Sequence, residues 1–176
     1  MSDTGTELSK KQKNLVAAKR AVEFVKQKMT IGASNKPLNS IFAFAKGLES
    51  PSECLSRIRS AKDEGGSNLS WLRAVAKRAE INGCGNCGEQ AAIAFCWLVD
   101  RGFRPTDYMI RVNADHAFVV IGRKVTGSSN DPKSWGADAV VCDPWDGSSY
   151  PASQIKGKMW GGGIVTPNSL CRVEEK

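Results

Sequence analysis

The residue types that most often carry catalytic chemistry are scarce in this chain of 176 residues. It contains one histidine, His116, so any reaction that depends on a histidine must use that residue. One of the six cysteines, Cys87, stands in the glycine-containing turn 85–88 and begins an apolar helical stretch. The unpaired N–H groups at the start of such a helix stabilise a thiolate and can hold an oxyanion. These features favour Cys87 as a nucleophile.

A cysteine nucleophile needs a base, and the base needs a group that orients it. His116 begins the strand-like run 116–121, where its ring can reach toward the start of a helix. Asp143 ends a second strand-like run, 139–143, because Pro144 cannot continue the hydrogen-bond ladder. If the two strands are neighbours, the carboxylate and the imidazole meet. The sequence therefore favours His116 as a general base and Asp143 as its orienting group, each at the end of a strand.

The turn at 83–88 also matches the dinucleotide-binding pattern G-x-G-x-x-G through Gly83, Gly85 and Gly88. That pattern indicates a dinucleotide site only where a buried strand comes before the turn. The preceding residues, 73–80, are polar and helical, so the sequence argues against such a site.

The same turn contains a C-x-x-C pair, Cys84 and Cys87, which is typical of a redox dithiol or of half a zinc site. A redox motif of the thioredoxin kind also requires a preceding strand, which this sequence lacks. Zinc needs four ligands, and the side chains of suitable chemistry are Cys84, Cys87, His116 and Cys142. A zinc-binding or basic interaction module without catalysis is therefore the alternative to an enzyme.

The elements that must position these residues divide the chain into two regions. Residues 1–9 are expected to form a disordered tail, 10–80 a basic helical region and 81–176 the catalytic core, all within one compact domain. Apolar spacings of three and four predict helices at 10–29, 38–48, 51–62, 69–80 and 89–100. Strand-like runs follow at 108–112, 117–121, 139–142, 150–155 and 164–165. The predicted fold class is α+β, with a helical N-terminal layer followed by one buried helix on a small antiparallel sheet.

The positive charge excess lies in the first half of the chain. Residues 1–80 contain 15 basic and 8 acidic residues, a net charge of +7, whereas residues 81–176 contain 10 of each. A basic face can attract nucleic acid, anionic membranes or an acidic protein. Because the basic residues are interleaved with acidic residues and no aromatic stacking platform accompanies them, a nucleic-acid partner is not expected. No apolar run reaches the ~18 residues of a membrane span, so none is expected.

The six cysteines do not imply three disulfides in this chain. Cys54, Cys96 and Cys171 fit small buried apolar side chains in regular stretches. The first residues, 1–13, do not resemble a cleavable secretory signal. Synthesis in a reducing cytoplasm, where disulfides are rare, is therefore expected.

The order and flanks of the candidate residues resemble the transglutaminase-like branch of the papain-like cysteine enzyme superfamily. The matching runs are GNCGEQA at 85–91, HAFVV at 116–120 and VVCDPW at 140–145. The resemblance covers about residues 83–146 and implies a papain-like or transglutaminase-like core. By position it implies three roles: nucleophile for Cys87, general base for His116 and orienting group for Asp143.

Compact basic proteins with these three runs resemble bacterial effectors and toxins that act as cysteine proteases or protein glutamine deamidases. The resemblance thus implies an enzyme without a cofactor or metal that acts on a protein or peptide, such as a host or target-cell protein. It also implies secretion without a cleavable signal.

The chain departs from the papain-like family before the nucleophile. Papain-like proteases usually carry an oxyanion-hole glutamine there, and no glutamine lies between Lys28 and Cys87. The candidates for that role are Asn82, Asn86 and the backbone at Gly88. Deamidation, transglutamination and proteolysis all stay open, because the three reactions share one triad.

Overall fold

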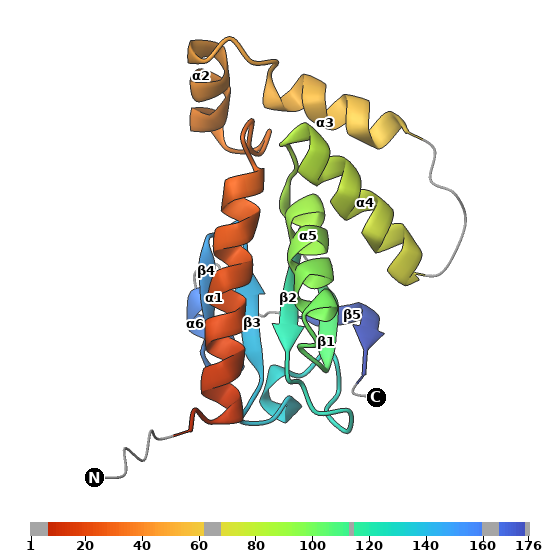
Figure 1. Cartoon of the computed structure of the whole chain (residues 1–176). Helices are drawn as coiled ribbons and strands as arrows, with labels where there is room; N and C mark the ends of the chain where they lie inside the picture. Colours follow the sequence, from red (N-terminus) through yellow and green to blue (C-terminus); the bar gives the residue numbers. More distant parts are fainter. Residues whose placement is uncertain (1–6, 62–67, 113–114, 160–165, 175–176) are drawn as a thin grey trace.

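The computed structural model describes residues 7–61, 68–112, 115–159 and 166–174. Most of the expected tail at 1–9 and the expected strand at 164–165 lie outside these ranges. In the described residues six α-helices accompany a five-stranded antiparallel sheet, which confirms the predicted α+β class. Figure 1 shows two of the helices, α1 (Lys10–Lys28) and α5 (Cys87–Asp100), side by side along the sheet.

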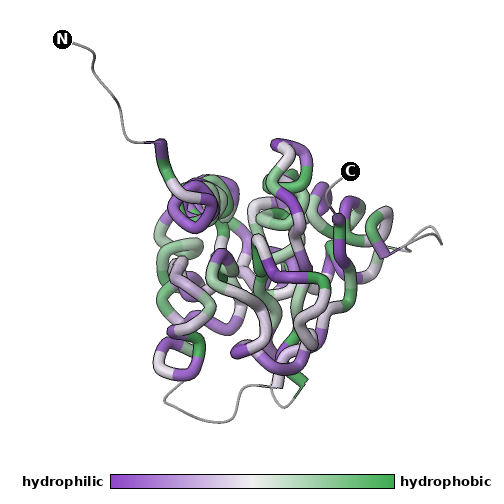
Figure 2. Tube along the Cα trace, turned by 90° about the horizontal axis from the view of Figure 1, so that it is seen from below, coloured by the Kyte–Doolittle hydropathy of each residue, from purple (hydrophilic) through white to green (hydrophobic). Residues whose placement is uncertain are grey.

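The first helix, α1 (Lys10–Lys28), begins at a capping box in which Ser9 accepts from the N–H of Gln12 and the Gln12 side chain accepts from that of Ser9. Its buried face consists mainly of small apolar residues: Ala17, Ala18, Ala21, Val22 and Val25. Figure 2 looks along this helix and shows hydrophilic and hydrophobic residues around it. The small side chains allow α1 to pack closely against α5 (Cys87–Asp100) and the sheet.

Three further helices precede α5: α2 (Pro37–Ala45), α3 (Pro51–Ser60) and α4 (Asn68–Asn82). The start of α3 is fixed by a second capping box between Ser50 and Glu53, as the sequence predicts. In Figure 1, α3 lies across the end of the molecule at which α5 begins, whereas α4 ends there and runs beside α5. The helical N-terminal region therefore borders the start of the proposed nucleophile helix.

The sheet has the strand order β4-β3-β2-β1-β5. The strands are β1 (Thr106–Arg111), β2 (His116–Ile121), β3 (Val140–Asp143), β4 (Ser148–Pro151) and β5 (Pro167–Val173). One face packs against α5, whose side chains Ile93, Phe95 and Leu98 are fully buried. A second apolar cluster, which contains Phe118 and Trp135, packs together with the short helix α6 (Ile155–Lys158). The central strand β2 is consequently buried along its whole length.

Two strand predictions were inaccurate at the C-terminal end. The run predicted at 150–155 forms a strand only up to Pro151 and then turns into helical structure. The edge strand β5 was not predicted, because polar residues such as Asn168 and Arg172 interrupt its apolar pattern. It is held instead by pairing with β1 and by a buried carboxylate, Asp107, which accepts from Arg123 and Arg172.

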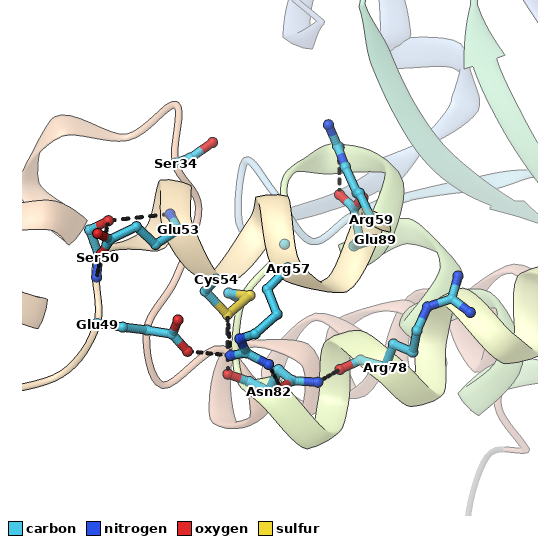
Figure 3. The surroundings of a disulfide bond; sticks show 12 residues. Ser34, Glu49, Ser50, Glu53, Cys54, Arg57, Arg59, Arg78, Asn82 and Glu89 are labelled. Carbon is cyan, nitrogen blue, oxygen red and sulfur yellow. Dashed lines mark hydrogen bonds and ion pairs between the residues drawn. A yellow bond between two sulfur atoms is a disulfide. The ribbon is translucent and has the colours of Figure 1, made fainter. Parts of the chain in front are cut away.

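A disulfide joins Cys54 of α3 to Cys84 in the turn before α5, with the two Cα atoms 6.2 Å apart. Figure 3 shows this bond beside the ion pair of Arg59 and Glu89. Cys54 is fully buried, as expected of a small apolar side chain, but it is bonded to Cys84, a pairing that the sequence did not predict. The sequence places them 30 residues apart, and only the packing of α3 on α4 brings them together. Because disulfides are rare in reducing compartments, this bond removes the support that the cysteines gave to a reducing cytoplasm.

Reduction of this disulfide is expected to lower the free energy of unfolding by about 3–4 kcal/mol, because the bond closes a loop of some 30 residues. Denaturant unfolding with and without a reductant measures the effect. The double variant Cys54→Ala/Cys84→Ala is the control, since it should lose the same stability and no longer respond to reductant. Equal unfolding midpoints for oxidised and reduced wild-type protein would contradict the expectation.

Candidate active site

The cysteine proposed as nucleophile is the first residue of α5 and is 6% exposed. The turn before it is held on both sides. The Asn86 N–H donates to Glu89 Oε2 over 3.0 Å, and Gln90 Nε2 donates to the carbonyl of Gly85 over 2.8 Å. Gly85 must be glycine, because a Cβ atom there would lie 2.5 Å from Cβ of Glu89. The sequence thus fixes Cys87 at a helix start.

The histidine and the aspartate meet at the same end of the molecule. In the antiparallel register Val119 of β2 pairs with Cys142 of β3, which brings the start of β2 next to the end of β3. His116 Nε2 and Asp143 Oδ2 are 2.6 Å apart, and both side chains are buried. In Figure 1 the start of β2, the end of β3 and the start of α5 all lie toward the same end.

The orientation of this pair is fixed by its surroundings. The second carboxylate oxygen of Asp143 accepts from the N–H of Asp146 over 3.2 Å. The ring of Trp145 meets the imidazole of His116 edge-on with centroids 5.7 Å apart, and Phe118 stacks at 6.2 Å. Aromatic rings on two sides shield the hydrogen bond between His116 and Asp143 from water, which strengthens it.

The electrostatics of the site favour a protonated histidine. Burial alone would lower the pKa of His116, but hydrogen bonds to Asp143 and to Cys87 outweigh it and raise the pKa from 6.5 to about 9. Because Nε2 faces Asp143, Nδ1 is the ring nitrogen available to the thiol. The Cys87 thiol also lies 3.7 Å from the carbonyl oxygen of Asp115. An imidazolium beside a cysteine sulfur is the arrangement that activates a thiolate.

A cavity of about 240 Å³ opens onto the cysteine and the histidine. Its walls include Arg59 of α3, Cys87 and Gly88 of α5, Tyr108 of β1 and His116 of β2, together with the residues that precede α5 and β2, Asn86 and Asp115. The sulfur and the ring therefore face one space, in which a substrate carbonyl can meet both.

The three oxyanion-hole candidates lie in different places relative to the cavity at Cys87. Asn86 and Gly88 line the cavity at Cys87, but Asn82 does not. Asn82 accepts from Arg57 through Oδ1 and donates to the carbonyl of Arg78 over 2.8 Å. Figure 3 shows it below Cys54 of the disulfide. The Oδ1 atom of Asn86 accepts from the N–H of Ser34 over 2.9 Å, which leaves the amide NH₂ as the donor end of that side chain.

The four predicted zinc ligands are not brought together. The sulfur of Cys84 is bonded to Cys54, and the Cys142 thiol donates to the carbonyl of Ala18 in α1 over 3.5 Å. Within residues 7–61, 68–112, 115–159 and 166–174, no group of three or more histidine, cysteine or acidic side chains is placed to hold a metal ion.

Sequence reasoning missed three residues of this site. Arg59 of α3 forms a bidentate ion pair with Glu89, with N–O distances of 2.7 and 3.0 Å. Tyr108 donates from its hydroxyl to the carbonyl of Gly88 over 3.3 Å, and Gln90 holds the turn. One signal was available for Arg59, because an acid in an otherwise apolar helix needs a basic partner when it is buried.

Comparison with known proteins finds no protein-family model that matches the chain and no significantly similar curated protein. Among the described residues, none of the helices has both the length and the apolar character that crossing a membrane requires.

Proposed function

We propose that this chain is a cysteine-dependent enzyme that transfers the acyl group of a protein or peptide amide to Cys87. The observation that carries the proposal is the buried contact of 2.6 Å between His116 and Asp143 beside a thiol at the start of a helix. The resemblance to transglutaminase-like and papain-like enzymes in residues 83–146 supports the same reaction class.

The reaction begins from an ion pair in which the thiol proton of Cys87 already lies on Nδ1 of His116, because the raised pKa of His116 keeps its ring protonated. The thiolate attacks the amide carbon, and the carbonyl electrons move onto oxygen, where the N–H groups near Gly88 and the Asn86 amide can hold them. The carbonyl re-forms as the C–N bond breaks, and His116 gives its proton to the departing nitrogen. Ammonia or an amine leaves, and a thioester remains on Cys87. Water or an amine, deprotonated by His116, then attacks the thioester and restores the thiol.

The product depends on which amide and which acceptor enter the cavity. A glutamine side chain with water gives deamidation, with an amine it gives transglutamination, and a main-chain amide gives proteolysis. The proposal extends to a protein or peptide as partner, such as a host or target-cell protein, and to a secreted effector or toxin as the biological setting.

Selective alkylation of Cys87 by iodoacetamide at pH ~6 tests whether the thiol is activated. Burial raises the pKa of the other three free thiols, Cys96, Cys142 and Cys171. The pKa of Cys96 is raised to about 12. Peptide mapping should find Cys87 modified at least about 100-fold faster than Cys171, because only a thiolate reacts. His116→Ala should abolish the advantage. Equal rates for Cys87 and Cys171 in the wild-type protein would count against an activated nucleophile.

A further inference from the structure

A second cavity, of about 300 Å³, adjoins the one at Cys87. The two cavities share three wall residues: Arg59, Gly88 and Tyr108. Its volume lies at the lower end of the range of about 300–1,000 Å³ that ligand pockets occupy. Gly88 directly follows the proposed nucleophile, so a substrate chain whose amide lies at the sulfur can extend past Gly88 into this second space.

The walls of the second cavity combine apolar surface with charged side chains. The apolar part comes from Ile58, Trp71 and Val75 together with the ring of Tyr108. Trp71 is 39% exposed, which is unusual for a tryptophan that serves only the core. A side chain that enters from the substrate would cover this ring.

Among the described residues, the charged part of the wall holds two guanidinium groups and one carboxylate. Glu89 binds Arg59 through both of its oxygens, so their charges largely cancel. Arg78 of α4 places a second guanidinium group on the same wall. In Figure 3 the Arg78 side chain extends away from Asn82. A guanidinium beside aromatic rings is suited to a carboxylate and to an aromatic face.

We propose that this cavity is a specificity subsite for the residue next to the reactive amide. It takes a large apolar side chain, best an aromatic one, on Trp71 and Tyr108, and an adjacent acidic group near Arg78. The inference rests on the proposed acyl transfer for its position beside the reacting amide. It assigns a role to the basic helical region, because Ile58, Trp71 and Arg78 come from α3 and α4.

Binding of short fluorescent peptides to the Cys87→Ala protein tests the subsite without turnover. Each peptide has a central glutamine flanked by one of four pairs: Phe with Glu, Phe with Lys, Ala with Glu, or Ala with Lys, in both orders. The pair of Phe with Glu should bind about tenfold more tightly than either peptide with one change, because an apolar contact and a charge contact are each of that size.

Two substitutions in the subsite, each with a matched control on the other side of α4, separate the two contacts. Arg78→Glu should reverse the preference for Glu over Lys, whereas Lys77→Glu, an equal charge change beside another cavity, should not. Trp71→Ala should remove the preference for Phe, whereas Ile81→Ala, which removes an apolar side chain that is 73% exposed, should keep it. If Arg78→Glu does not fold, Arg78→Gln should still abolish the charge preference.

The outcomes distinguish this inference from the acyl-transfer proposal. If all four peptides bind alike, or if the controls and subsite variants behave alike, the subsite is wrong. If the preferences appear as expected but the wild-type protein converts none of the peptides, the subsite stands as a binding site and acyl transfer is wrong.

Discussion

Replacement of Cys87 by alanine is expected to lower amide turnover by at least about 10⁴-fold, because the variant has no nucleophile to form the thioester. Substrate binding should change little, since the methyl group of alanine leaves the walls of the cavity in place. The measurement is the release of ammonia or amine from glutamine-containing peptides at saturating substrate. Cys171→Ala is the matched control, because that free thiol lies on the edge strand β5 and outside the cavity.

The control decides how a loss of activity is interpreted. Cys171→Ala should keep turnover within about twofold of the wild-type value, because substitutions remote from a site usually add little. Loss of activity in both variants would indicate a folding defect. Full activity in a folded Cys87→Ala protein would show that another residue is the nucleophile.

Replacement of Asp143 by alanine is expected to lower turnover by about 10²–10⁴-fold, because His116 would lose the group that orients its ring and stabilises its charge. The carboxylate lies 2.6 Å from Nε2 of His116. Among the described residues that line the cavity at Cys87, His116 is present and Asp143 is not. Asp143 therefore acts through His116 and is a positioning residue. Asp146→Ala is the control, since the contact from residue 146 to Asp143 comes from its backbone N–H.

A pH profile separates this positioning role from a merely structural one. The hydrogen bonds to Asp143 and Cys87 raise the pKa of His116 to about 9, so the imidazolium persists up to that pH in the folded protein. Activity that depends on the imidazolium should therefore fall as the pH rises through about 9. The stability that the raised pKa contributes should be complete below pH 6.5 and should be lost as the pH rises through about 9. In Asp143→Ala the basic limb should move toward 6.5.

The single histidine makes this shift directly observable. Its Cε1 proton gives one NMR titration curve, which must belong to His116. An unchanged midpoint in Asp143→Ala would show that the aspartate does not set the protonation of the ring. A shift in Asp146→Ala as large as that in Asp143→Ala would contradict the assignment to Asp143.

The elements that hold the candidate triad were predictable, because their signals are local. The glycine turn and the apolar run placed Cys87 at the start of a helix. One strand run begins at His116 and another ends at Asp143, so the two side chains were expected to meet if the strands were neighbours. The antiparallel pairing of β2 with β3 then brings the two side chains together. Each of these inferences needed only a few neighbouring residues.

The features that were missed depend on contacts between distant segments. The disulfide joins residues 30 positions apart, and nothing in the flanks of Cys54 or Cys84 marks them as partners. Arg59 lies 30 residues from Glu89 and reaches the site only because α3 crosses the start of α5. The edge strand β5 is stabilised by its pairing with β1 instead of by its own apolar pattern.

The basic first half of the chain thus contributes to the site as well as to the surface. Several of its basic residues are exposed in ordinary helix faces, but Arg59 and Arg78 line the cavities next to Cys87. The disulfide fixes α3 to the turn before the nucleophile. The division into a helical region at 10–80 and a core at 81–176 consequently describes sequence composition better than it describes the site.

Trapping of a covalent acyl-enzyme tests the central claim most directly. The wild-type protein is mixed with glutamine-containing peptides, quenched with acid within the first turnover and analysed by intact mass and peptide mapping. We predict an added mass equal to the peptide less ammonia, or to the acyl fragment of a cleaved peptide, located on Cys87 and absent from Cys87→Ala. Product that forms with no such adduct, or an adduct that persists in Cys87→Ala, would contradict acyl transfer through this cysteine.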